Sequence, residues 1–261
     1  MRIREFPCLL VSSMSALPDT PSLPKTILYT LWCRLSFALV LASFGVLALI
    51  LPGLRNRQRI ARQGVRLAWT MCGLRPIITG LDRLPRTNAI VVANHASYLD
   101  GVLLMGVLPV GYVFVAKREM ASVPLAGWLL RRLGTAFVER RSVTDSARDA
   151  RMILRLAQQG TPLVFFPEGT IPSKSALGPF RLGAFLVAAH LNWPVVPMSL
   201  TGTAAVLPDD GRWRLFRAPL HVHVHALIRP NGHQRRELTR LRDQARGFIE
   251  EGLARPTDGR P

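Results

Sequence analysis

Short apolar runs that alternate with helical segments constrain the fold of this chain most. Five runs have the length and composition of strands, at residues 89–93, 112–116, 135–138, 163–166 and 195–200. The segments between them contain amphipathic or capped stretches that we expect to be helices, at residues 124–133, 144–159 and 182–191. Alternation of this kind is typical of a sheet with helices packed on its faces. The sequence therefore predicts a single α/β domain.

A polar segment, residues 94–100, directly follows the first apolar run and places His95 five positions before Asp100. Positions five apart on an ideal helix point about 140° away from each other, so the two side chains can meet only if the chain turns. We expect His95 in a loop, Ser97 at the start of a helix and Asp100 in its first turn. A carboxylate there would fix the tautomer of the imidazole and raise its basicity, as for a general base. The alternative is that Asp100 is only a solvated or capping group.

Three more blocks follow in order along the chain. They cover residues 114–120 with 124–128 and 134–140, then 165–170 with 179–185, and finally 195–202. Together with Asn94, His95, Ser97 and Asp100 they resemble the 1-acyl-sn-glycerol-3-phosphate acyltransferase family, also called lysophosphatidic acid acyltransferases or phospholipid/glycerol acyltransferases. The resemblance extends from residue 77 to 227. It implies a single glycerol-3-phosphate-acyltransferase-like domain, with a mixed sheet flanked by helices, after an N-terminal membrane-associated helix pair.

The resemblance also implies a reaction of phospholipid biosynthesis. A fatty acyl group would pass from acyl-CoA or acyl carrier protein to the hydroxyl of a lyso-lipid, and the best single candidate is 1-acyl-sn-glycerol-3-phosphate, giving phosphatidate. His95 would take the hydroxyl proton, a step that typically contributes about 10² to 10⁴ in rate. Backbone N–H groups at residues 168–170 are candidates for the oxyanion site. No cofactor beyond the acyl donor is expected, and no cysteine lies near His95 in the sequence to form an acyl-enzyme.

Substrate contacts are predicted from the same blocks. In family terms Glu168 and Gly169 position the acceptor, and the cations Lys117 and Arg140 could clamp a phosphate. Alternatively, these two cations are the solvated ends of strands. The remaining predicted substrate-binding residues are Asn94, Ser97, Thr170, Lys174 and Arg181.

Ile171 departs from the family pattern. Many members carry an arginine here, which the resemblance assigns to the phosphate of the acceptor. Lys174 or Arg181 could supply the missing cation from nearby. A different acceptor, such as lyso-ornithine lipid, would explain the isoleucine equally well.

The charge of the chain favours anionic partners. Lysine and arginine total 34 against 16 acidic residues, which gives a net charge of +18. A hydrophobic content of 49% and a mean hydropathy of +0.21 favour a membrane over nucleic acid. The alternative without an enzymatic activity is a basic peripheral membrane or nucleic-acid-binding protein in which His95 and Asp100 are structural.

The N-terminal quarter predicts membrane attachment. Residues 35–52 are uncharged and largely apolar, about 27 Å long as a helix, which is borderline for a hydrocarbon core of about 30 Å. Extending this helix through Arg34 is unattractive, because the charge would then lie inside the membrane. After a break at Pro52, Arg59, Arg62 and Arg66 share one face of a second helix, as expected for an interfacial helix. The arginines favour the inner membrane with the catalytic domain facing the cytoplasm.

We therefore expect four parts: a loose leader at 1–24, membrane-associated helices at 25–75, the acyltransferase domain at 76–230, and a C-terminal helix with a disordered tail at 231–261. The helix should span residues 235–254, with its apolar residues against the domain. Residues 220–228 should form a strand that projects His221, His223 and His225 toward solvent from one face. No metal site is expected there, because no cysteine or nearby carboxylate completes one.

Overall fold

In the computed structural model, residues 23–85, 88–139, 143–171, 177–209 and 214–255 are described. Within them, seven strands form one sheet in the order β1-β7-β6-β2-β5-β3-β4. All neighbouring strands are parallel except β6 and β7, which are antiparallel, so the sheet is mixed as predicted. The strands are β1 (Ile77–Thr79), β2 (Ile90–Ala93), β3 (Val113–Lys117), β4 (Ala136–Val138), β5 (Leu163–Phe165), β6 (Val195–Thr201) and β7 (His221–Val224).

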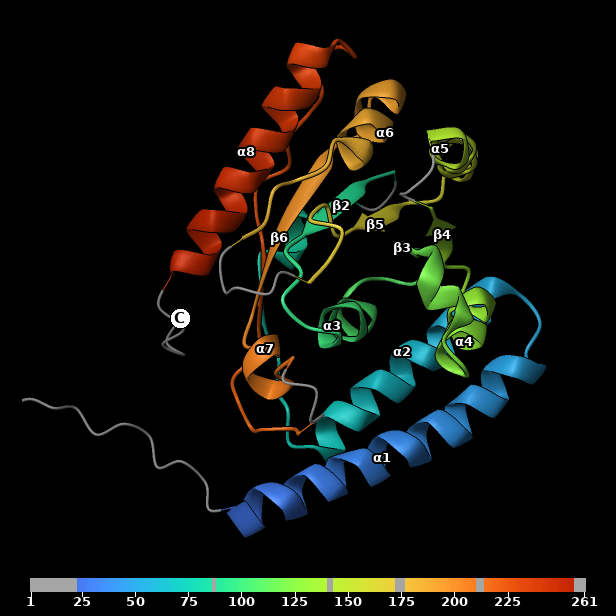
Figure 1. The fold of residues 1–261 in the computed structure, drawn as a ribbon, viewed down its shortest axis with the longest axis vertical. Coiled ribbons are helices and arrows are strands. Elements are labelled where there is room, and N and C mark those ends of the chain that lie inside the picture. The colour runs from blue at the N-terminus through green and yellow to red at the C-terminus, as the bar shows by residue number, and fades with distance from the viewer. Residues whose placement is uncertain (1–22, 86–87, 140–142, 172–176, 210–213, 256–261) are drawn as a thin grey trace, which may run out of the picture.

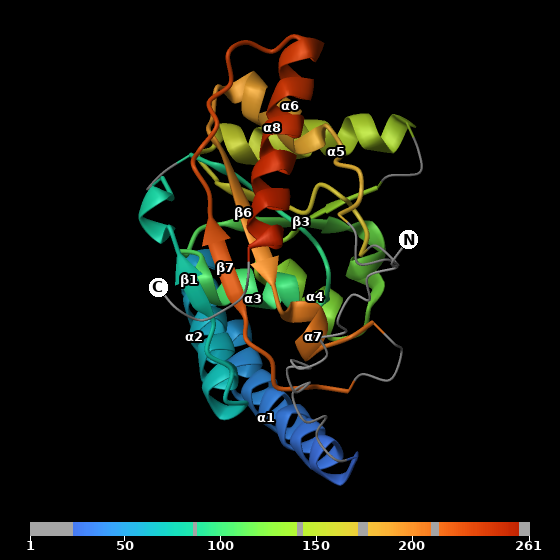
Figure 2. The same cartoon turned by 90° about the vertical axis from the view of Figure 1, so that its left-hand side faces the viewer.

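Helices cover both faces of this sheet (Figures 1 and 2). On one face lie α5 (Val143–Gln158), α6 (Gly183–Leu191) and α8 (Arg235–Ala254); on the other lie α1 (Leu23–Ile50), α2 (Leu54–Met71) and α3 (Leu99–Val107). The shorter elements are η1 (Leu81–Arg83), η2 (Arg118–Ser122), α4 (Ala126–Arg132) and α7 (Thr203–Val206). The predicted α/β class is therefore confirmed, and the strands predicted from the five apolar runs and the three helices predicted between them lie within about two residues of the observed bounds.

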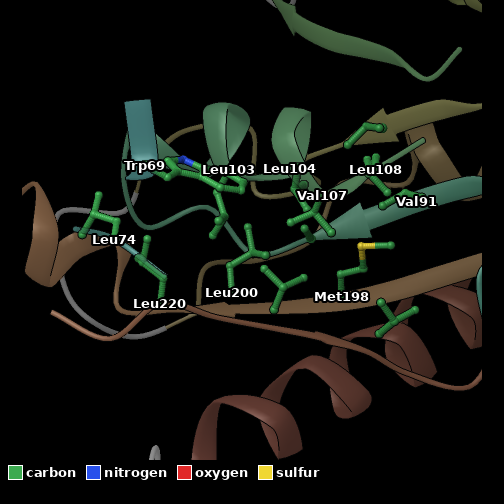
Figure 3. Close-up of a cluster of buried hydrophobic side chains, with 14 of the residues drawn as sticks. Trp69, Leu74, Val91, Leu103, Leu104, Val107, Leu108, Met198, Leu200 and Leu220 are labelled. Atoms are coloured by element: carbon green, nitrogen blue, oxygen red, sulfur yellow. The ribbon is translucent and has the colours of Figure 1, made fainter. Parts of the chain in front are cut away.

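Two hydrophobic clusters fix the helices to the sheet. Because successive side chains of a strand point to opposite faces, Val91 enters one cluster while Ile90 and Val92 enter the other. Figure 3 shows the first cluster, in which α2, α3, β2 and β6 meet. Its labelled members are Trp69, Leu74, Val91, Leu103, Leu104, Val107, Leu108, Met198, Leu200 and Leu220.

Helix α8 docks on the second face over β6, and its bounds match the prediction. Leu241, Ala245 and Ile249 are fully buried, as expected for its apolar stripe. Near its end Gly252 allows a close approach, because a Cβ there would lie 2.1 Å from Ser199 Oγ.

The three histidines at residues 221, 223 and 225 are not all placed as predicted. Strand β7 ends at Val224, so His225 lies beyond it and is buried under α8 rather than facing solvent. Its Nε2 lies 2.6 Å from Ser199 Oγ, and its ring stacks on Phe248. The prediction of three solvent-facing imidazoles is therefore wrong for His225, because α8 covers this part of the sheet. Among the described residues, no group of three metal-ligating side chains is close enough to hold a metal ion.

Helix α1 also differs from the prediction, because it continues without a break through Arg34. Residues 24–48 are long and apolar enough to cross a membrane by length and composition. Cys33 and Ser36 are buried, whereas Arg34 lies on the exposed side of the same helix. The backbone is satisfied by its own helical hydrogen bonds, so a charge that points outward does not interrupt it.

Helix α2 uses part of its arginine face to contact the protein. Arg62 donates from Nε to the carbonyl oxygen of Gly106 and from a terminal nitrogen to that of Val107, and Arg66 Nε donates to Gly106 at 2.9 Å. These carbonyls lie in the last turn of α3, where no helical partner exists and the helix dipole is negative. Two of the three arginines on this face of the predicted interfacial helix therefore bind the protein itself. Arg59, on the same face, contacts only its neighbour Asn56 among the described residues.

The contact between α2 and α3 generates a stability prediction. Replacing Arg62 and Arg66 together by Gln should lower the free energy of unfolding by about 2 kcal/mol, because three hydrogen bonds from cations to terminal carbonyls are weakened. Arg59→Gln is the matched control and should change it by less than about 0.5 kcal/mol. Chemical unfolding in detergent measures both. Equal effects of the two changes would contradict the assigned contacts.

His225 generates a pH prediction. Burial, then the neighbouring His223 and Arg255, lower the pKa of His225 to about 4. An unfolded chain with an ordinary histidine pKa near 6.5 binds this proton earlier, so stability should fall as pH drops from about 6.5 to about 4. The melting temperature should therefore fall less steeply over this range in His225→Gln than in the native protein. Parallel curves would refute this role of His225.

Candidate active site

His95 and Asp100 meet at the end of β2. The Nδ1 atom of His95 lies 2.9 Å from Oδ2 of Asp100, and this same oxygen accepts the backbone N–H groups of Ala96 at 2.6 Å and Ser97 at 2.8 Å. Asp100 lies in the first turn of α3, which begins at Leu99 and not at Ser97 as expected. The turn between the two residues brings them together in the way their spacing requires.

This arrangement determines which nitrogen of His95 is available. Oδ2 already accepts two backbone N–H groups, so Nδ1 of His95 is the donor to it, and in the neutral imidazole Nε2 then keeps its lone pair. Asp100 is fully buried, whereas the side chain of His95 is 21% exposed. The ring is therefore oriented by a buried carboxylate and remains accessible from outside.

Phe166 lies against the ring of His95, with the two ring centroids 4.3 Å apart and an angle of 21° between the planes. It directly follows β5, the neighbour of β2 in the sheet. No role was predicted for Phe166. Phe166 lies beside His95 because β5 pairs with β2. Strand order cannot be read from a sequence, so the sequence carried no usable signal for this contact.

Glu168 connects the third block to the His95 loop. Its Oε1 accepts the backbone N–H of His95 at 2.8 Å, and its Oε2 accepts that of Gly178 at 2.7 Å. The residue is buried, with 7% of its surface exposed. Both carboxylate oxygens are thus occupied by the backbone, and the carboxylate holds the base in place.

The turn at Gly169 excludes one of the backbone N–H groups predicted to bind the oxyanion. Gly169 has a φ of 80°, a backbone angle that favours glycine, and its N–H donates to the carbonyl of Phe166 at 3.0 Å. This N–H closes the turn, so it is removed from the predicted donors. The N–H groups of Glu168 and Thr170 stay candidates, and the side chain of Thr170 is exposed.

Asn94 and Ser97 face the interior. The amide of Asn94 makes two hydrogen bonds with the backbone of Leu200 on β6, at 2.7 and 2.9 Å. Ser97 Oγ donates to the carbonyl of Leu207 and accepts the N–H of Leu99. Both side chains are buried and have partners within the protein, which corrects the expectation that they touch substrate. They tie the His95 loop to β6 and to the end of α7.

Of the cations predicted to bind substrate, Lys117 and Arg181 lie within the described residues. Lys117 ends β3, and Arg181 is exposed while its backbone N–H donates to the carbonyl of Pro167 at 2.9 Å. The backbone of Arg181 therefore lies beside the turn that carries Glu168. Arg140 and Lys174 lie outside the described residues. Because β2, β5 and β3 are parallel neighbours, the segments that follow them meet at one edge of the sheet.

Asp149, another residue without a predicted role, ties this edge to α5. It is buried, pairs with Arg118 after β3 at 2.9 Å, and accepts the backbone N–H of Glu139 after β4. Its sequence position inside a helix gave no signal for this contact. The carboxylate connects the chain after two strands to the helix that covers them.

Comparison with known proteins identifies acyltransferases as relatives of this chain. A family model described as acyltransferase matches residues 75–201. A chloroplastic 1-acyl-sn-glycerol-3-phosphate acyltransferase of Brassica napus is 33% identical over 178 residues, which cover 67% of this chain and 50% of that protein. A lyso-ornithine lipid O-acyltransferase of Pseudomonas aeruginosa is 32% identical over 224 residues, or 78% of this chain and 83% of that protein.

The fold also resembles a solved structure. The crystal structure of the 1-acyl-sn-glycerophosphate acyltransferase PlsC from Thermotoga maritima aligns with a TM-score of 0.72 at 23% identity, covering 90% of this chain and 99% of that one. This chain spans about half the length of the Brassica relative. On the strength of the matched family model and the well-covered Pseudomonas relative, the chain belongs to the acyltransferase family that includes the 1-acyl-sn-glycerol-3-phosphate acyltransferases.

Proposed function

We propose that this protein transfers a fatty acyl group from acyl-CoA or acyl carrier protein to the hydroxyl of a lyso-lipid. The observation that carries the proposal is the oriented His95, whose Nδ1 is bound by Asp100 and whose Nε2 has no hydrogen-bond partner in the part of the chain that is described. A base held in one tautomer beside an accessible edge is suited to deprotonate an alcohol.

In the proposed reaction, the hydroxyl oxygen of the acceptor attacks the thioester carbonyl while Nε2 of His95 takes its proton. The tetrahedral intermediate then expels the thiolate by breaking the C–S bond, and the imidazolium returns the proton to the leaving sulfur. Asp100 stabilises the imidazolium through its bond to Nδ1. Candidate donors to the oxyanion are the N–H groups of Glu168 and Thr170.

The best candidate acceptor is 1-acyl-sn-glycerol-3-phosphate. Arg181 supports it, because its backbone bonds to Pro167 beside the turn and its exposed side chain suits bidentate binding of a phosphate. Lys117, Lys174 and Arg140 are further candidates. Lyso-ornithine lipid is the second candidate. It is favoured by Ile171, which stands where many family members carry an arginine. It is also favoured by the long alignment between this chain and the Pseudomonas lyso-ornithine lipid O-acyltransferase.

The site of the reaction is proposed to be the cytoplasmic face of the inner membrane. The apolar helix α1 and the arginines that follow it support attachment with the catalytic domain on that side. Membrane lipids, the lyso-lipid acceptor and the acyl donor are then the expected partners.

Replacing His95 by Ala should lower the transfer rate by about 10³-fold, and Asp100→Asn by about 10²-fold, because the base or its orientation is lost. Membranes carrying each protein are incubated with lysophosphatidate or lyso-ornithine lipid and either donor, and products are measured by mass spectrometry. His190→Ala, an exposed histidine on α6, is the control and should retain full activity. Absence of transfer by the native protein to both acceptors from both donors would favour a binding protein without this activity.

Glu168→Gln should lower kcat by at least about tenfold while membrane binding is unchanged. The amide has only one accepting oxygen, so the backbone N–H of His95 or of Gly178 loses its partner, at a cost of about 1–3 kcal/mol. The control is Glu250→Gln, an exposed residue of α8. An unchanged kcat would argue against Glu168 as the support of the His95 loop.

A further inference from the structure

Three large apolar side chains are exposed between the end of η2 and the first turn of α4. They are Val123, Leu125 and Trp128, exposed to 42%, 63% and 40%, and we call them the α4 apolar patch. Single exposed apolar residues are ordinary on a protein surface, but three within six positions form a local cluster. Leu125 also has a φ of 64°, which is uncommon for a side chain of this kind.

The backbone beneath the patch is well fixed. Gly127 is buried so closely against η2 that a Cβ would lie 2.3 Å from the carbonyl oxygen of Ala121. Its N–H donates to the carbonyl of Val123 at 2.8 Å, and the N–H of Leu129 donates to that of Leu125. The apolar side chains are therefore presented by an ordered turn. Burial of Gly127 against η2 leaves Leu125 and Trp128 on the outer side.

The patch adjoins the apolar surface of the N-terminal helix. Helix α4 packs against α1, next to the connection from α1 to α2 (Figure 1). Along its length α1 exposes a series of large apolar side chains, namely Ile27, Leu28, Leu31, Trp32, Leu35, Leu39, Val46, Leu47 and Ile50. Helices α1 and α4, which are in contact, thus both expose large apolar side chains.

A cation accompanies these side chains. Arg131 is exposed in the last turn of α4 and the whole chain has a net charge of +18, whereas the half-exposed Arg118 of η2 is already paired with Asp149 and Glu139. Apolar side chains next to arginines fit an anionic lipid surface. The apolar side chains enter the boundary between headgroups and acyl chains, and the arginines stay at the headgroups. Tryptophan is also favoured at this depth because its ring is amphipathic.

We propose that the α4 apolar patch is a second lipid contact, which inserts into the same anionic membrane surface as α1. The segment follows β3, whose carboxyl end lies at the same edge of the sheet as the His95 loop. Contact at this point would turn the site toward the surface that contains the acceptor. The inference rests on the membrane location in the proposed function, but its binding test needs no activity.

Insertion is tested with the full-length protein and vesicles of phosphatidylcholine and phosphatidylglycerol. Leu125→Ser should weaken partitioning about tenfold at limiting lipid, the loss expected when one leucine no longer enters the membrane. The control is Leu186→Ser, the same substitution at a 42%-exposed leucine on α6, across the sheet from α1, and it should have no effect. Equal partitioning of the two variants would overturn the proposal.

A second measurement uses Trp128 as a probe of depth. Lipids brominated on the acyl chain should quench part of the native emission, and Trp128→Phe should reduce that part, leaving the share that comes from exposed Trp32 of α1. If the fraction quenched is the same in both proteins, Trp128 does not enter the membrane and the proposal fails. A change of oligomeric state in Leu125→Ser, with vesicle binding intact, would identify the patch as a protein interface and also overturn it.

Activity separates this inference from the proposed function. Leu125→Ser should lower transfer to an acceptor embedded in vesicles and retain transfer to a short-chain acceptor dissolved as monomers. Equal loss on both acceptors would mean damage to the site and would contradict a lipid contact. Absence of transfer by the native protein would refute the proposed function, while the vesicle measurements would still decide whether the patch binds lipid.

Discussion

The buried carboxylate of Asp100 is the constraint on which the site depends. One oxygen accepts from the imidazole of His95 and from two consecutive backbone N–H groups, so the same atom shapes the loop and orients the base. Burial makes this hydrogen bonding necessary, because an uncompensated carboxylate inside a protein is costly. Glu168 performs a related task from the adjacent strand end, where its two oxygens hold the backbone of His95 and of Gly178.

These contacts place the His95–Asp100 pair between two supports. At its first turn α3 carries Asp100, and at its last turn its carbonyls accept hydrogen bonds from Arg62 and Arg66 of α2. Helix α2 packs in turn against the apolar helix α1. The part of the chain expected at the membrane is therefore in direct contact with the helix that orients the base. Arg62 and Arg66 serve this packing and are engaged by the protein itself.

The sequence predicted the elements of the fold better than the partners of individual side chains. The bounds of α8 and its buried stripe follow from periodicity, because one helical face must be covered wherever the chain folds. His225 shows the limit: alternation placed it on a strand face, but α8 covers that position in the structure. Asn94, Ser97 and Phe166 likewise acquire their contacts from strands and helices distant in sequence.

By itself the sequence determined the α/β class, the succession of blocks at strand ends and the pairing of His95 with Asp100. These depend on local periodicity and on a spacing of five residues, which are properties of the chain alone. Only the tertiary structure decided that Phe166 stacks on the base, that Glu168 binds backbone, and that Arg62 and Arg66 hold α3. Such contacts follow from strand order and helix packing, which bring together residues that no local pattern relates.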